Sequence, residues 1–191
     1  MRRRLSAEAR RAEIIEITQQ AIVEDGYRSL SLREIARRCG MSTPGLMHHF
    51  PDLTTLLEAV LGHRDELDRT AIMGASTLDA SLLETLDAVR RYYGARSDEV
   101  RSFDSLEAEA QDPNHPAHDY FRRRDELTFD VLGRLIDREF EDPEHVSRVL
   151  RLLLDGLRVE RLRSVGRAAD TGAQWDAIER VVDAQPRKTG R

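Results

Sequence analysis

Residues 29–57 constrain the fold most strongly, because their pattern predicts two short helices joined by a tight turn. Ser31 precedes an apolar-periodic run and is followed three residues later by a glutamate, which is the capping-box pattern of a helix N-terminus. The run then stops at Gly40, and glycine adopts the left-handed conformation that a sharp turn between helices needs. The segment is therefore expected to begin as a capped helical hairpin.

A second short helix is predicted directly after the glycine turn, from Thr43 to about His49. Ser42 can cap its first turn, and Pro44 lies where a missing backbone N–H costs nothing. These are the ingredients of a helix-turn-helix, which places its second helix in the DNA major groove. The alternative is a purely structural helical hairpin, because many such hairpins carry the same capping and turn signals.

The exact residues of this segment favour the helix-turn-helix. They resemble the DNA-binding domain of TetR-family transcriptional regulators at Arg33-Glu34-Ile35-Ala36, Gly40-Met41-Ser42, Gly45-Leu46 and His48-His49-Phe50-Pro51. The resemblance implies an all-α chain, with an N-terminal three-helix helix-turn-helix domain and a C-terminal helical domain for ligand binding and dimerisation. We expect the DNA-binding domain over residues 7–67, with the helix-turn-helix at about 31–50, the second domain over 68–185, and a disordered tail over 186–191.

The expected DNA-binding side chains lie in and around the second helix of the hairpin. Arg33 offers a bidentate fork that matches guanine, and Ser42 lies where a phosphate oxygen can approach a helix N-terminus. Both His48 and His49 can donate to phosphates or bases. With the positions that the resemblance implies, the predicted set is Arg33, Ser42, Thr43, Pro44, Gly45, Met47, His48 and His49.

Two residues depart from the pattern of the family. Met47 stands where the family usually has tyrosine, and Leu53 stands where it usually has lysine. Both of the usual side chains commonly contact phosphates, and each neutralised phosphate that is missing flattens the salt dependence of binding. We therefore expect weaker non-specific DNA affinity than in a typical family member, unless a basic arm at residues 2–4 compensates.

The net charge of −5 is distributed unevenly along the chain. Residues 1–50 hold nine arginines and six acidic residues, whereas residues 51–191 hold 21 basic and 29 acidic residues. The basic part coincides with the predicted helix-turn-helix. This asymmetry fits a phosphate-facing end joined to an acidic body.

Helical spacing of apolar residues continues through most of the chain, and no segment alternates apolar and polar residues as a half-buried strand does. No apolar run approaches the length of a membrane span, and the basic N-terminus lacks the apolar region of a signal peptide. A single cysteine suits a reducing compartment. We therefore expect a cytoplasmic location. The pattern predicts helices over residues 7–25, 52–69, 81–94, 98–110, 117–140, 144–164 and 172–183, with a linker at 71–80.

The helix over residues 144–164 is apolar around most of its circumference, so it needs cover on two sides. One side can be its own core and the other a partner subunit, and the resemblance implies a homodimer formed by the last two helices of each chain. The alternative is a helix buried wholly inside a monomer. The predicted interface residues are Leu152, Leu154, Val159 and Leu162.

The resemblance also implies a ligand cavity between the helices from about Leu53 to Leu157. The larger side chains there are the candidates to line it, namely Phe103, Leu106, Tyr120, Phe121, Arg124 and Arg158. An inward-facing Arg124 or Arg158 would suit an acidic ligand, because a buried cation requires a partner.

The remaining clusters of titratable residues favour structural roles over metal binding or catalysis. Adjacent His48 and His49 diverge by about 100° on a helix and chelate one ion poorly. For Asp112, Asn114 and the histidines beside them, turn bonds are favoured over a metal site. Cys39 is favoured as a packed residue over a redox sensor. No nucleophile motif, phosphate loop or zinc spacing is present, so no metal, no cofactor and no enzyme activity are predicted.

The sequence therefore predicts a sequence-specific DNA-binding regulator, a homodimeric, ligand-released repressor on a pseudo-palindromic DNA operator. Two alternatives stay open. One is a DNA-binding protein that no ligand controls, and the other is a helical small-molecule-binding protein or enzyme that shares the hairpin.

Overall fold

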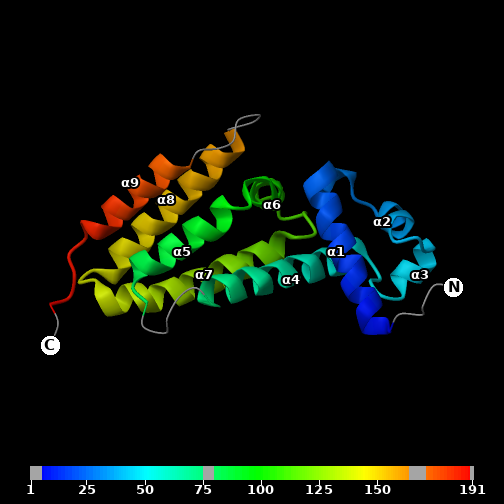
Figure 1. Cartoon of the computed structure of the whole chain (residues 1–191), viewed down its shortest axis with the longest axis horizontal. Coiled ribbons are helices and arrows are strands. Elements are labelled where there is room, and N and C mark those ends of the chain that lie inside the picture. Colours follow the sequence, from blue (N-terminus) through cyan, green and yellow to red (C-terminus); the bar gives the residue numbers. More distant parts are fainter. Residues whose placement is uncertain (1–5, 75–79, 164–170, 190–191) are drawn as a thin grey trace. The chain divides into compact units, whose positions relative to one another are not determined.

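The computed structural model describes residues 6–74, 80–163 and 171–189 (Figure 1). Over these ranges the chain is helical, and strand pairing is limited to one isolated bridge between Phe140 and Arg187, so the all-α prediction is confirmed. No described helix is long and apolar enough to cross a membrane. The elements are α1 Ala7–Asp25, η1 Tyr27–Ser29, α2 Leu32–Arg38, α3 Thr43–Met47, α4 Leu53–Gly74, α5 Leu82–Gly94, α6 Ser97–Glu109, α7 His118–Glu139, α8 Pro143–Arg163 and α9 Gly172–Asp183.

The chain divides into two compact units. Unit 1 consists of residues 1–67 and 105–121, and unit 2 consists of residues 68–104 and 122–191. Unit 1 thus combines the expected DNA-binding segment with the end of α6 and the start of α7, which the sequence assigned to the second domain. The division falls inside α4, α6 and α7, so three helices run from one unit into the other.

Helix boundaries follow local signals closely. The observed α1 and α9 have the predicted limits. In contrast, α3 ends at Met47 rather than His49, because the next turn tightens and the His49 N–H donates to the Leu46 carbonyl at 2.8 Å. The predicted linker is also corrected, since α4 continues to Gly74. Residues 75–79 of that linker lie outside the described residues.

The core of unit 1 joins the first four α-helices. Its fully or almost fully buried apolar side chains include, in chain order, Ile14, Ile22, Ile35, Ala36, Leu46, Phe50, Leu56, Leu57 and Val60. The polar residue Thr18 is fully buried on α1, and its hydroxyl donates to the Ile14 carbonyl at 2.7 Å. That internal bond satisfies the hydroxyl and lets threonine occupy a core position.

The core of unit 2 is built by α5, α7, α8 and α9 (Figure 1). Its two largest side chains are buried Phe140, directly after α7, and buried Trp175 on α9. Aliphatic residues complete the cluster at Leu82, Leu86, Leu132, Ile136, Val146, Leu150, Leu157, Ile178 and Val182. Much of the apolar surface of α8 is therefore covered within its own chain.

The segment after α9 is ordered by pairing with the α7–α8 turn. The Glu141 N–H donates to the Pro186 carbonyl at 3.0 Å, and the Lys188 N–H donates to the Glu139 carbonyl at 2.9 Å. Between them, Arg187 pairs with Glu139 at 3.1 Å. The prediction of a disordered tail from residue 186 is therefore wrong for residues 186–189, and residues 190–191 lie outside the described residues.

Candidate nucleic-acid interface

The turn between α2 and α3 has the geometry that its glycine predicts. Gly40 adopts φ 63°. Its N–H donates to the Arg37 carbonyl at 3.1 Å, and the Met41 N–H donates to the Ala36 carbonyl at 2.9 Å. This pair of bonds is the Schellman motif, which satisfies the last carbonyls of α2 and reverses the chain sharply. The left-handed conformation expected for Gly40 is confirmed.

The second helix of the hairpin begins at a side-chain cap. The Ser42 hydroxyl accepts a hydrogen bond from the Gly45 N–H at 3.1 Å, and Pro44 occupies the first turn. A Cβ atom at Gly45 would lie only 3.1 Å from the Ser42 Oγ atom. Glycine is therefore favoured at position 45, because it leaves room for the cap that starts α3.

The cap of α2 differs from the predicted reciprocal capping box. The Ser31 hydroxyl accepts from the Glu34 N–H at 3.2 Å, but the Glu34 carboxylate accepts from Arg37 Nη2 at 2.6 Å and from Arg38 Nε at 3.0 Å. Hydrogen bonds from Arg37 and then Arg38 lower the pKa of Glu34 to about 2. A complete capping box does form at the start of α5, between Ser81 and Glu84.

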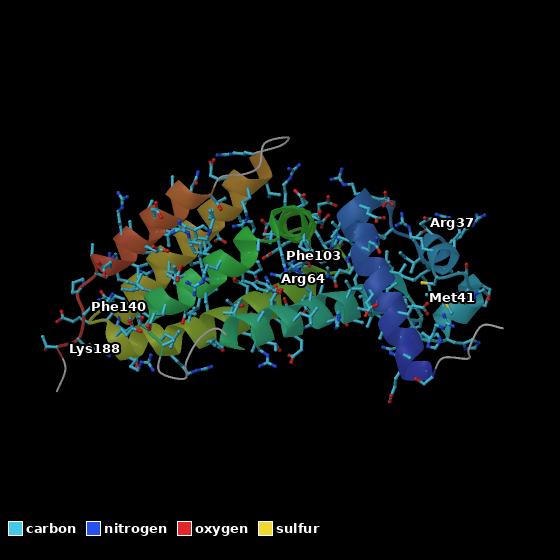
Figure 2. The ribbon with its side chains drawn as sticks, in the orientation of Figure 1. Arg37, Met41, Arg64, Phe103, Phe140 and Lys188 are labelled. Atoms are coloured by element: carbon cyan, nitrogen blue, oxygen red, sulfur yellow. The ribbon has the colours of Figure 1, made fainter. Side chains whose placement is uncertain are left out.

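The two arginines at the end of α2 have different surroundings. Arg38 pairs with Glu24 at 3.0 Å and also with Asp25, so its guanidinium ties α2 to the end of α1. Arg37 is exposed at the surface of the hairpin, next to the turn that holds Met41 (Figure 2). Of the two, Arg37 has the guanidinium that is accessible to an incoming phosphate.

The residues predicted to face DNA lie together on α2, α3 and the turn after α3. Arg33, Ser42, Pro44, Met47 and His48 are exposed, whereas Thr43, Gly45 and His49 are partly exposed. Met47 is 47% exposed although it is apolar. The intervening Leu46 and the following Phe50 are fully buried, so they fix α3 in the core while its other faces remain accessible.

Arg11 on α1 makes two contacts that the sequence did not predict. Its Nη1 atom donates to the His49 carbonyl, and its guanidinium carbon lies 4.1 Å from the centroid of the Phe50 ring. The two contacting positions lie almost forty residues further along the chain. Nothing in the local pattern around Arg11 distinguishes it from neighbouring arginines.

The loop between α6 and α7 packs against η1 inside unit 1. The rings of Tyr27 and His115 have centroids 4.6 Å apart, and Arg28 pairs with Glu109 at 3.2 Å. The expected turn bonds are confirmed, because the Asn114 N–H donates to Asp112 Oδ1 at 2.9 Å. Among the described residues, no group of three potential ligands is arranged to hold a metal ion.

The ring of His115 favours its neutral form. Its Nδ1 atom accepts from the Ala117 N–H at 3.1 Å, and its buried Nε2 atom has no hydrogen-bond partner in the described structure. Burial lowers the pKa of His115 below its ordinary value of 6.5, and this outweighs the opposing effect of Glu109 and Asp112. The folded protein therefore binds fewer protons here than the unfolded chain.

From this we predict that acid weakens unit 1 through His115. The free energy of unfolding should fall as the pH is lowered below 6.5, since protonation then favours the unfolded chain. Urea unfolding across a pH series should show a smaller fall for His115→Gln than for the natural chain. Equal pH dependence in the two proteins would contradict the assignment.

The residues predicted to line a ligand cavity are divided between the two units. Leu106, Tyr120 and Phe121 belong to unit 1, whereas Phe103, Arg124 and Arg158 belong to unit 2. In unit 1 the Tyr120 hydroxyl donates to Asp65 at 2.6 Å. In unit 2 the Nε atom of Arg158 lies 4.0 Å from buried Asp104, so an acidic group of the chain itself balances this charge.

The four predicted dimer residues differ in exposure. Leu152 is 67% exposed and Val159 is 43% exposed, so α8 presents apolar surface to solvent. Leu162 is partly exposed, and Leu154 packs partly against the core of unit 2. On the adjacent helix α9, Val181 is also exposed.

Comparison with known proteins identifies the N-terminal segment. Residues 14–60 match the family described as bacterial regulatory proteins, tetR family. The HTH-type transcriptional regulator BetI of Burkholderia thailandensis is 39% identical over 75 residues, which is 38% of this chain and 38% of the relative. BetI of Klebsiella pneumoniae is 34% identical over 82 residues, or 42% of each chain. The matches thus span less than half the length of these relatives.

Solved structures extend the similarity over most of the chain. A TetR transcription regulator from Haloarcula marismortui has a TM-score of 0.79 at 26% identity, covering 93% of this chain and 98% of its own. A structure described as a transcriptional regulator from Saccharomonospora viridis in complex with choline has a TM-score of 0.74 at 17% identity, with 96% and 100% covered.

These matches confirm the predicted family. Residues 14–60 resemble the tetR family of bacterial regulatory proteins, and the described chain has the all-α fold of a solved TetR transcription regulator. The related proteins are transcriptional regulators rather than enzymes, in agreement with the expected class of protein.

Proposed function

We propose that the chain is a sequence-specific DNA-binding transcriptional regulator that acts as a homodimer. The proposal rests on the structure of the α2–α3 hairpin. The left-handed Gly40 and the Ser42 cap fix the start of α3, and buried apolar side chains hold this helix against the core while its other faces stay accessible. A helix held in this way can enter the major groove, where every base pair has a distinct pattern of donors and acceptors.

The surface of α3 supports a division between phosphate and base contacts. The N-terminal turn offers the Ser42 hydroxyl and backbone donors that suit phosphates, whereas the partly exposed Thr43 hydroxyl can reach a base edge. Exposed His48 can donate to a phosphate or a base edge, and exposed Met47 suits apolar contact with a thymine methyl group. We therefore assign base reading to α3, with Arg33 from α2 beside it.

Homodimerisation through α8 and α9 is supported by the exposed apolar side chains Leu152, Val159 and Val181. Two copies of α3 related by a two-fold axis would read half-sites about one helical turn, 34–36 Å, or a multiple of it apart. The expected operator is therefore a pseudo-palindrome.

A small-molecule effector would release the dimer from its operator, which would make the protein a repressor. Support comes from the similarly folded S. viridis protein, whose structure is described as a complex with choline. An effector shifts the equilibrium only by its differential affinity for the two conformations. In this chain the helices α4, α6 and α7 run between the units and can carry such a change.

The base-reading assignment is tested with Thr43→Ala and His48→Ala. Each variant should lose sequence preference by about tenfold, since a specific base contact contributes about 1–3 kcal/mol of discrimination. The measurement is the ratio of affinities for an operator selected from random DNA and for random duplex. His145→Ala, which removes an exposed histidine on α8, is the control. Retained preference in both test variants would contradict the assignment.

A further inference from the structure

We infer that Arg11 is a positioning residue for DNA recognition, which fixes the C-terminal end of α3 against α1. The inference rests on the proposed DNA-binding function and adds a residue outside the helix-turn-helix to it. Both groups that Arg11 contacts, the His49 carbonyl and the Phe50 ring, follow α3 directly.

The helix α3 needs such support because it is short. It has five residues, from Thr43 to Met47, so few internal hydrogen bonds hold it. Its N-terminal end is fixed by the Ser42 cap, but carbonyls at a helix C-terminus lack partners within the helix. Arg11 supplies a donor to a carbonyl of the turn after α3 and places a positive charge near the negative end of the helix.

The second contact joins Arg11 to the apolar anchor of α3. Phe50 is fully buried, and its N–H donates to the Leu46 carbonyl at 2.9 Å. The guanidinium of Arg11 lies 4.1 Å from the ring centroid, a cation–π distance. One side chain therefore restrains both the backbone at His49 and the ring at Phe50, which fixes the rotation of α3 about Leu46.

This restraint matters for specificity more than for overall affinity. Base edges are read only when side chains lie within about 0.5 Å of the productive geometry. Met47 and His48 stand between the buried Leu46 and the carbonyl that Arg11 holds, so a small rotation would move both. Phosphate attraction tolerates such a shift, because it depends mainly on charge.

Arg10 provides a matched control on the same helix. It carries the same charge one residue earlier, but it pairs with Glu13 of α1 instead of bonding to the turn after α3. Arg10→Ala and Arg11→Ala therefore remove equal charge from the same end of the protein. Only the second removes the contact with the end of α3.

The experiment measures the affinity of the full chain for a selected operator and for random duplex over a salt series. Arg11→Ala should reduce the operator-to-random ratio by about tenfold relative to Arg10→Ala, with equal salt slopes on random duplex. Arg11→Lys, which keeps the charge but loses the planar stack, should lie in between. If both alanine variants weaken the two DNAs by the same factor, Arg11 is a phosphate contact and the inference is wrong.

A measurement without DNA separates this inference from the proposed function. Amide hydrogen exchange should become faster at residues 46–50 in Arg11→Ala and stay unchanged there in Arg10→Ala. Unchanged exchange in Arg11→Ala would overturn the positioning role even if the protein binds DNA. Faster exchange in a protein that binds no specific DNA would refute the function and leave the structural contact intact.

Discussion

Replacing Leu152 and Val159 with glutamate is expected to leave a folded monomer that binds its operator at least about 100-fold more weakly. Both side chains are exposed on α8, so the change should cost little inside one chain. In the proposed dimer they would lie at the interface, where four buried carboxylates lack partners. Operator affinity would then fall because one recognition helix loses the gain of simultaneous binding to two half-sites.

Sedimentation and operator binding at one protein concentration measure this effect. The matched control is Leu127→Glu with Val131→Glu, which adds the same charge at exposed apolar positions on α7. The control should remain a dimer with full operator affinity. A dimeric Leu152→Glu/Val159→Glu variant would contradict the proposed interface, as would a natural chain that is itself monomeric.

Asp104→Ala is expected to lower the free energy of unfolding by about 3 kcal/mol, the largest single-residue effect that we predict for stability. Asp104 is 7% exposed and lies beside Phe103 on α6. Its carboxylate accepts from Arg161 Nε at 2.7 Å and from Arg161 Nη2 at 3.2 Å. Removing the carboxylate would leave the guanidinium of Arg161, and the nearby Arg158, without this counter-charge.

Urea unfolding at equal subunit concentration measures the loss. Asp155→Ala is the control, because Asp155 pairs with Arg158 at 3.4 Å but its side chain is 53% exposed. That exposed pair should contribute less than about 1 kcal/mol. Equally small losses of unfolding free energy for both variants would show that burial of the Asp104 carboxylate does not increase its contribution to stability.

Local signals were enough to predict most of the helices and the central hairpin. Ser31 and Ser42 cap their helices as expected, and Gly40 has the predicted left-handed conformation. These caps and this turn depend on residues within a few positions of one another, so the local sequence is enough to predict them. The family resemblance then assigned DNA-facing roles to the residues that this hairpin exposes.

Contacts between distant segments could not be predicted in the same way. Arg11 and Arg38 look alike in the sequence, yet one holds the turn after α3 and the other holds α1 against α2. The pairing of His115 with Tyr27 depends on how the α6–α7 loop packs, and loop packing leaves no periodic pattern. The Glu34 carboxylate can accept either from the backbone N–H at the start of α2 or from a guanidinium group. It accepts from the guanidinium groups of Arg37 and Arg38, because hydrogen bonds from charged donors are stronger.

The most direct test of the central claim is selection of duplexes by the full chain from random DNA, followed by footprinting of the selected site. We predict an inverted repeat with two protected half-sites, whose centres lie about one helical turn or a multiple of it apart. Binding without enrichment of any sequence would indicate a non-specific DNA-binding protein. Absence of binding even at low salt would contradict the assignment of α3 as a recognition helix.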